Sequence, residues 1–325
     1  MPMRSLLALL ALSTSLFAQA QKPLPADDAV RVAEFYRLAA LIEDKIWPGW
    51  SKTPAPLLLV TSDTEYLTHF PAPPRDFQKI GDDIYARPRQ FPPNMQATFP
   101  GFGFPPVIVI GKPSNTQSKT STPWLFVVMH EHFHQLQWAQ PDYLKAIADL
   151  GLSKGDATGM WMLNYPFPYD NPEFAESFGY LRDSLLHALN EVDKQKFDQL
   201  SKQYLKDRKQ FFAQLLPGDH KYFSFQLWQE GVARYTQVKS AEAAEGYQPS
   251  PAYAALPDFT LFSNYAVIAR SRTLDELKHI DIAQSKREVF YSFGAAEALL
   301  LDRVNPTWKD QYFQHLLTTD PLFAK

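Results

Sequence analysis

The stretch from Trp124 to His134 constrains the fold of this chain more than any other. Six apolar residues in a row, Trp124-Leu125-Phe126-Val127-Val128-Met129, lead directly into His130-Glu131-His132-Phe133-His134. An apolar run without a polar stripe predicts a helix that is buried nearly all round. Ionisable residues at the end of a buried helix cost free energy unless they are paired or bound to a metal. We therefore expect a chemical role for this cluster.

The spacing of the histidines indicates what that role is. His130 and His134 are four residues apart, which places both on one face of an α-helix. In a His-Glu-x-x-His pattern the two imidazoles can bind one Zn²⁺, while Glu131 can act as a general base on a metal-bound water. His132 points to the opposite side of the helix and is excluded from this site. Two structural histidines on a packed helix are the alternative interpretation, but the burial of the helix favours a metal.

A third protein ligand must come from elsewhere, because catalytic zinc usually takes three and the chain has no cysteine. Glu230 is the main candidate. Glu176, on a predicted helix, and Asp156, in a glycine-flanked loop, lie closer to His134 in sequence and remain alternatives. An acidic residue near a helix start also has an ordinary explanation, since the helix dipole favours it there.

The sequence around Glu230 resembles a motif of a known protein family. Together with the His-Glu-x-x-His pattern it resembles the gluzincins, zinc metallopeptidases whose third ligand is a glutamate on a later helix. Their aminopeptidase branch has Trp-Leu-x-Glu-Gly-x-Ala-x-Tyr at that glutamate, and the matching residues here are Trp228, Glu230, Gly231, Ala233 and Tyr235.

The resemblance implies that His130, His134 and Glu230 bind zinc and that Glu131 is the general base. It covers only these two motifs and the strand before the first. Glu230 also lies much further beyond the second histidine than the glutamate of those aminopeptidases does. The intervening helices must therefore form an insertion. We expect the small residues after Glu230 to let the two ligand-bearing helices approach closely.

Two further elements are weaker candidates for the site. Tyr291, and equally Tyr235, could donate a hydrogen bond to the oxyanion of a tetrahedral intermediate, although simple packing is the more common explanation for either tyrosine. The strand 107–110 could be an edge strand that pairs with an extended peptide, or an ordinary core strand. No Gly-x-Met-x-Asn element of the kind that the resembled aminopeptidases use is present.

The pattern along the chain predicts a mostly helical α+β fold, zincin-like, with a small sheet early in the chain. Strands are predicted at 57–60 and 107–110, with an irregular packed loop at 71–106 and a proline-rich connection at 247–264. Thr122, followed by Pro123, is the predicted N-cap of the histidine helix. We expect residues 21–325 to form a single domain, divided into an α/β part (21–140) and a helical part (141–325). The predicted helices are 27–47, 172–189, 192–216, 222–243, 288–304 and 306–317.

The N-terminus predicts export. Arg4, the apolar run 6–17 and the small residues 18–20 have the pattern of a signal peptide cleaved after Ala20, which would make the protein secreted or periplasmic. The 32 basic and 35 acidic residues nearly balance, which gives no case for binding nucleic acid or an anionic membrane surface. The partner that the resemblance to the gluzincins implies is a peptide or protein substrate.

These inferences favour an exported zinc metallopeptidase that binds one Zn²⁺ per chain. Two alternatives remain at this stage. The first is an exported protein with a zincin fold that binds a partner and catalyses nothing. The second is a zinc hydrolase that acts on a non-peptide amide or ester. The substrate, and the choice between endopeptidase and exopeptidase, depend on a pocket shape that the sequence does not reveal.

Overall fold

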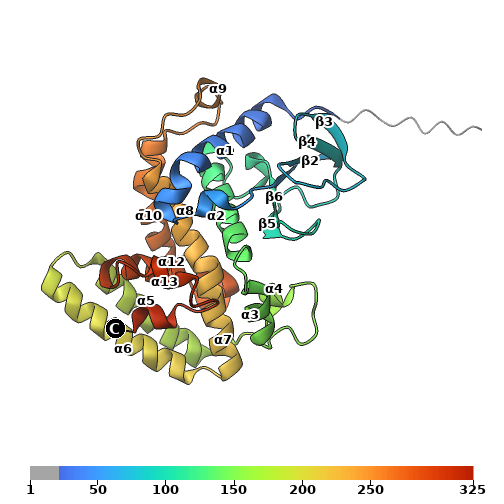
Figure 1. The fold of residues 1–325 in the computed structure, drawn as a ribbon. Helices are drawn as coiled ribbons and strands as arrows, with labels where there is room; N and C mark the ends of the chain where they lie inside the picture. The colour runs from blue at the N-terminus through green and yellow to red at the C-terminus, as the bar shows by residue number, and fades with distance from the viewer. Residues whose placement is uncertain (1–21, 325) are drawn as a thin grey trace, which may run out of the picture.

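The computed structural model describes residues 22–324 and has the predicted mostly helical α+β class. The predicted signal peptide lies outside the described residues. One six-stranded sheet is built from the first third of the chain, and most of the remaining residues are helical (Figure 1). Among residues 22–324, no helix combines the length and the apolar character that crossing a membrane requires.

The sheet has the order β3-β4-β2-β1-β6-β5, in which only the β1–β6 pair is parallel. The parallel pair β1 and β6 are the apolar runs of the sequence, and both strands are fully buried. β5 forms one edge of the sheet and β3 the other. The strands are β1 (Leu57–Val60), β2 (Thr64–Thr68), β3 (Gln78–Gly81), β4 (Ile84–Pro88), β5 (Gln96–Phe99) and β6 (Val107–Gly111).

One prediction about this region was wrong. The segment 71–106 is not wholly irregular, because it contains β3, β4 and β5. These strands are only four or five residues long and carry little apolar character, so their alternation is too brief to stand out against the surrounding prolines. Of the two alternatives for the strand at 107–110, the ordinary core strand is correct, since β5 pairs along the outer side of β6.

The helical part is arranged around α2, the predicted histidine helix, which crosses the middle of the molecule (Figure 1). The helix α1 lies along it on one side and α8 on another, while α5 and α6 pair with each other further away. The principal helices are α1 (Ala26–Ile46), α2 (Ser121–Trp138), α3 (Tyr143–Asp149), α5 (Pro172–Asn190), α6 (Lys194–Gln214), α7 (Pro217–Gln226), α8 (Val232–Ala243), α10 (Phe262–His279) and α12 (Val289–Val304). Shorter helices are α4 (Trp161–Asn164), α9 (Pro251–Ala254), α11 (Ile282–Ser285) and α13 (Lys309–Tyr312), and the short η segments are η1 (Trp50–Lys52), η2 (Pro113–Asn115), η3 (Leu227–Gly231), η4 (Lys286–Glu288) and η5 (Asp320–Phe323).

Several predicted helix boundaries needed correction. α10 was missed, and the connection predicted at 247–264 contains α9 and the start of α10. The predicted helix 306–317 is reduced to the single turn of α13. α2 begins at Ser121 and not after Thr122, whose hydroxyl instead donates to the carbonyl of Thr260 (2.6 Å) and ties the helix start to the chain before α10.

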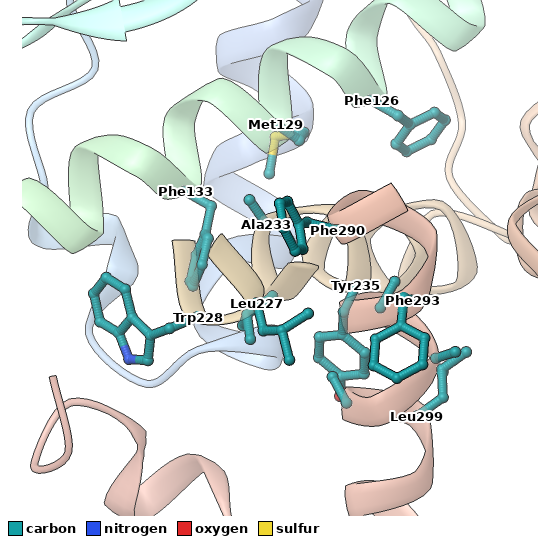
Figure 2. Close-up of a cluster of buried hydrophobic side chains, with 14 of the residues drawn as sticks. Phe126, Met129, Phe133, Leu227, Trp228, Ala233, Tyr235, Phe290, Phe293 and Leu299 are labelled. Atoms are coloured by element: carbon teal, nitrogen blue, oxygen red, sulfur yellow. The ribbon is translucent and has the colours of Figure 1, made fainter. Parts of the chain in front are cut away.

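The core between α2, α8 and α12 is rich in aromatic side chains. Figure 2 shows Met129 and Phe133 pointing from α2 toward the segment that carries Leu227 and Trp228, whereas Phe126 lies further along α2, where its ring stacks on that of Tyr265 in α10. Phe290 and Phe293 close the same cluster from α12. Because these side chains are all buried, the three helices are held at fixed distances from one another.

Candidate metal centre

The helix α2 is a rigid base for the functional side chains. Of its 18 residues, 15 are buried, as its sequence predicts. Two polar contacts fix it against the sheet. The indole of Trp124 donates to the carbonyl of Gly111 (2.8 Å), and the amide of Gln135 donates to the carbonyls of Pro56 (3.0 Å) and Pro106 (2.8 Å).

Glu230 lies on an unusual piece of backbone. Between α7 and α8 the chain continues without a break through η3, a π-helical turn that contains Glu230. A π-turn inserts one extra residue into a helix and is frequent at functional sites, because it redirects the side chains that follow it. The amide of Gln137 on α2 donates to the carbonyls of Trp228 (3.0 Å) and Gln229 (3.1 Å), and so fastens this turn to the histidine helix.

Three side chains from these two elements converge. Nε2 of His130 lies 3.2 Å from Nε2 of His134, and Oε2 of Glu230 lies 3.5 Å and 3.4 Å from the same two nitrogens. One tetrahedral ion with bonds of about 2.05 Å would require its ligand atoms to be about 3.3 Å apart. The observed spacings match that value, and the ligand atoms of all three residues lie within 4.8 Å of one another.

The hydrogen bonds of His134 orient its ring for ligation. Its Nδ1 lies 2.7 Å from Oε1 of Gln137 and 3.0 Å from the amide of Gln229. The amide nitrogen of Gln137 is occupied by two backbone carbonyls, so its oxygen faces the ring and accepts the Nδ1 proton. In the neutral form of His134 the lone pair is therefore on Nε2, which faces the other two ligand atoms.

His130 is held differently. Its ring stacks on that of Tyr291 with the centroids 5.9 Å apart and the planes 13° from parallel. Its Nδ1 is buried and has no hydrogen-bond partner within the part of the chain that the structure describes. Aromatic packing thus fixes this ring, whereas hydrogen bonds fix His134.

Burial and mutual charge decide the ionisation of the cluster. Burial lowers the pKa of His130. Burial also acts to lower the pKa of His134, but the charge of Glu230 and its hydrogen bond outweigh burial and raise that pKa to about 9. Burial acts to raise the pKa of Glu230, yet the charge of His134 and the hydrogen bonds of both histidines hold it well below its usual range. Glu230 is therefore ionised, which is the form in which a carboxylate binds a metal.

Glu131 lies on the wall of a cleft of about 510 Å³, next to His130. The hydroxyl of Thr98 is 2.9 Å from both the backbone carbonyl and Oε2 of Glu131, and it donates to them. Thr98 belongs to β5, so this contact joins the edge of the sheet to the histidine helix. One carboxylate oxygen of Glu131 is held in place by Thr98. Glu131 forms no ion pair with the ring nitrogens of His130 or His134.

Arg287 and Tyr291 line the same cleft from the C-terminal part of the chain. A guanidinium nitrogen of Arg287 donates to Oε1 of Glu230 (3.1 Å), and a second one donates to the hydroxyl of Tyr291 (3.3 Å). Burial raises the pKa of Tyr291 well above its ordinary value, so the hydroxyl keeps its proton and can donate it to a ligand in the cleft.

The other candidates from the sequence lie apart from this cluster. Glu176 is exposed on α5, and Asp156 accepts hydrogen bonds from backbone groups of its own loop. Tyr235 donates to Asp302 (2.8 Å), away from the cleft. His132 faces α1, where Nε2 lies 2.9 Å from Oε1 of Glu43.

One expectation about helix approach was wrong. Gly231 does not bring the two ligand-bearing helices together. A Cβ at Gly231 would lie 2.5 Å from Cα of Gly294, so the close approach is to α12, the helix that carries Tyr291.

Three residues of the site were missed in the sequence. Gln137 could have been found, because it follows His134 by three positions and lies on the same face of the helix. Thr98 and Arg287 gave no such signal, since they reach the site only through the pairing of β5 with β6 and the packing of α12.

Comparisons with known proteins do not add to this geometry. Neither models of protein families, nor curated proteins, nor solved structures give a match to this chain.

Proposed function

We propose that the protein is an exported zinc-dependent metallopeptidase with a gluzincin-like site. The observation that carries the proposal is the convergence of His130, His134 and Glu230 at tetrahedral spacing, with His130 and the neighbouring Glu131 on the wall of a cleft. Two imidazoles and one carboxylate are a ligand set that catalytic zinc uses. When bound there, zinc would polarise a carbonyl group and make a water molecule more acidic.

The residues of the chain provide the rest of the chemistry. With Oε2 of Glu131 engaged by Thr98, its Oε1 is available to accept a proton and later to return it to a leaving amine. Tyr291 keeps its hydroxyl proton and supports the negative charge that develops on the attacked carbonyl oxygen. Both side chains line the same cleft as His130, so one substrate could contact all three.

The edge strand β5 favours a peptide as the substrate. Gln96 on this strand lines the cleft. The N–H of Gly111 donates to the carbonyl of Met95 (2.8 Å), so the backbone groups of Met95 face β6. By the alternation of antiparallel pairs, the backbone groups of Gln96 and Thr98 then face the free edge. An extended peptide can pair with them next to Glu131.

The test is a Glu131→Gln variant, with Glu288→Gln on the same cleft wall as the matched control. Purified wild-type protein should contain a single zinc by elemental analysis and should cleave members of a fluorogenic peptide library. Glu131→Gln should keep the metal and lose about 10²- to 10⁴-fold in turnover, because only the proton acceptor is removed. Glu288→Gln should stay near wild type.

Other outcomes would lead to different conclusions. Undiminished peptide cleavage by Glu131→Gln, or wild-type protein that takes up no zinc, would refute the mechanism. A zinc protein that cleaves no peptide but hydrolyses simple esters or acyl amides would change the substrate class. A zinc protein inactive on every substrate would be a binding protein.

A further inference from the structure

We propose that Arg287 is a positioning residue that restricts Glu230 to one oxygen at the metal centre and aims Tyr291 at the same place. The inference rests on the proposed zinc site and deepens it. Arg287 lies in η4, far from the metal-ligand motifs in the sequence, and no motif of the chain pointed to it.

The two oxygens of Glu230 have separate partners. Oε2 faces the imidazoles, at 3.5 Å from His130 and 3.4 Å from His134. Oε1 accepts from a guanidinium nitrogen of Arg287 at 3.1 Å. An ion pair with arginine thus occupies the oxygen that would otherwise be free to turn toward the metal.

The same guanidinium also holds Tyr291. A second nitrogen donates to the tyrosine hydroxyl (3.3 Å), and the guanidinium carbon lies 5.4 Å from the centre of its ring. The Tyr291 ring in turn stacks on the imidazole of His130, so Arg287 positions a residue that contacts the proposed metal ligand. A planar guanidinium holds two partners at fixed angles, whereas the ammonium of a lysine has three donors but no fixed planar geometry.

The other two arginines of the cleft are differently placed. Arg234 is engaged by Glu276 (2.5 Å), and Arg272 is exposed on α10. Among the residues that the structure describes, neither has an ion pair with Glu230. A general effect of positive charge in the cleft can therefore be separated from the specific contact of Arg287.

Loss of Arg287 should change how the carboxylate binds. With Oε1 released, Glu230 can present both oxygens, and the second would compete for the position that a catalytic zinc keeps for water. Tyr291 would lose its hydrogen bond at the same time. We therefore expect both an altered metal site and slower turnover.

The experiment uses Co²⁺ in place of zinc in the full protein, because tetrahedral cobalt absorbs visible light more strongly than five-coordinate cobalt. Arg287→Met should lower that absorption, change the metal affinity by about tenfold or more, and reduce peptide turnover. Arg272→Met is the matched control and should leave spectrum and affinity unchanged. Tyr291→Phe should reduce turnover while keeping the wild-type spectrum.

Circular dichroism of the metal-free variants checks that they fold. If Arg287→Met does not fold, Arg287→Lys takes its place, and it should show the same changes to a smaller extent. A folded Arg287→Met, or failing that Arg287→Lys, with the wild-type spectrum and affinity would overturn the inference and leave the zinc site standing. Wild-type protein that binds neither Co²⁺ nor Zn²⁺ would overturn the site itself, and with it the inference.

Discussion

The contact between Gly231 and Gly294 allows a sharp test of how the site is held. Gly231 has a helical backbone (φ −62°, ψ −47°), so alanine fits the local conformation. The difficulty is space. The added Cβ would lie 2.5 Å from Cα of Gly294, 2.9 Å from its carbonyl carbon and 3.1 Å from the carbonyl oxygen of Phe290. All three atoms belong to the backbone, so the two helices must move apart.

The expected magnitude follows from two opposing effects. Overpacking of a tight contact costs about 1–3 kcal/mol, and rigid backbone neighbours place this case at the upper end. Replacing a helical glycine by alanine returns about 0.5–1 kcal/mol. Gly231→Ala should therefore lower the free energy of unfolding by about 2 kcal/mol, a factor of about 30 in the ratio of folded to unfolded protein. The zinc affinity should fall as well, because Glu230 is the adjacent residue.

The same substitution at Gly179 is the control. Gly179 lies within α5, and a Cβ there would meet nothing within 4 Å. Gly179→Ala should therefore stabilise the protein by about 0.5–1 kcal/mol. Urea unfolding of the metal-free variants measures both values, and competition with a chelator measures the zinc affinity. If Gly231→Ala proved as stable as Gly179→Ala, the backbone contact would not be what fixes η3 against α12.

Three further predictions concern other parts of the site and the core. Gln137→Leu removes the acceptor of the His134 Nδ1 proton and should weaken zinc binding by about 10- to 100-fold in chelator competition; an unchanged affinity would show that Gln137 does not orient His134. Thr98→Val should keep the zinc content but reduce peptide turnover by about tenfold, because the carboxylate of Glu131 loses a hydrogen bond, and equal turnover would contradict this role. Burial lowers the pKa of Lys309 to about 8, below its value of about 10.5 in an unfolded chain. The unfolded state therefore binds more protons between pH 8 and pH 10, and this residue adds stability as the pH rises through that window. Lys309→Met should show a smaller rise in urea midpoint over that range, and identical profiles would refute the assignment.

The sequence predicted the helices whose apolar residues form a long run or recur on one face over several turns. The apolar run before His130 predicted a buried helix, and α2 is buried at nearly every position. The amphipathic stretches of α1, α5 and α6 were found close to their observed bounds. In each case the apolar residues recur over several helical turns, so that the pattern exceeds chance.

The elements that were missed depend on tertiary contacts. The strand β5 is four residues long and half-buried, and its backbone is ordered by pairing with β6. Helix α10 has exposed apolar residues such as Val267 and Ile268, which blur its amphipathic pattern. Arg287 meets Glu230 across 57 residues of sequence. Local composition carries no record of such contacts.

The π-turn shows the same limit within the motif itself. The residues around Glu230 predicted a helix, which is correct, but not the extra residue that sets the direction of its carboxylate. The spacing to the histidines gave no help either, since they lie on a different helix.

The hydrogen bonds of the Gln137 amide bear on whether the protein folds before or after it binds a metal. Because it joins the histidine helix to η3 through backbone carbonyls, the two ligand-bearing segments are bound to each other by groups that are not ligands. The aromatic core of Figure 2 adds to this attachment. The centre is thus preorganised, unlike small zinc domains that remain unfolded until the ion arrives. If the proposed metal binds there, the chain can complete its folding first and take up the ion afterwards, from whatever pool surrounds the finished protein.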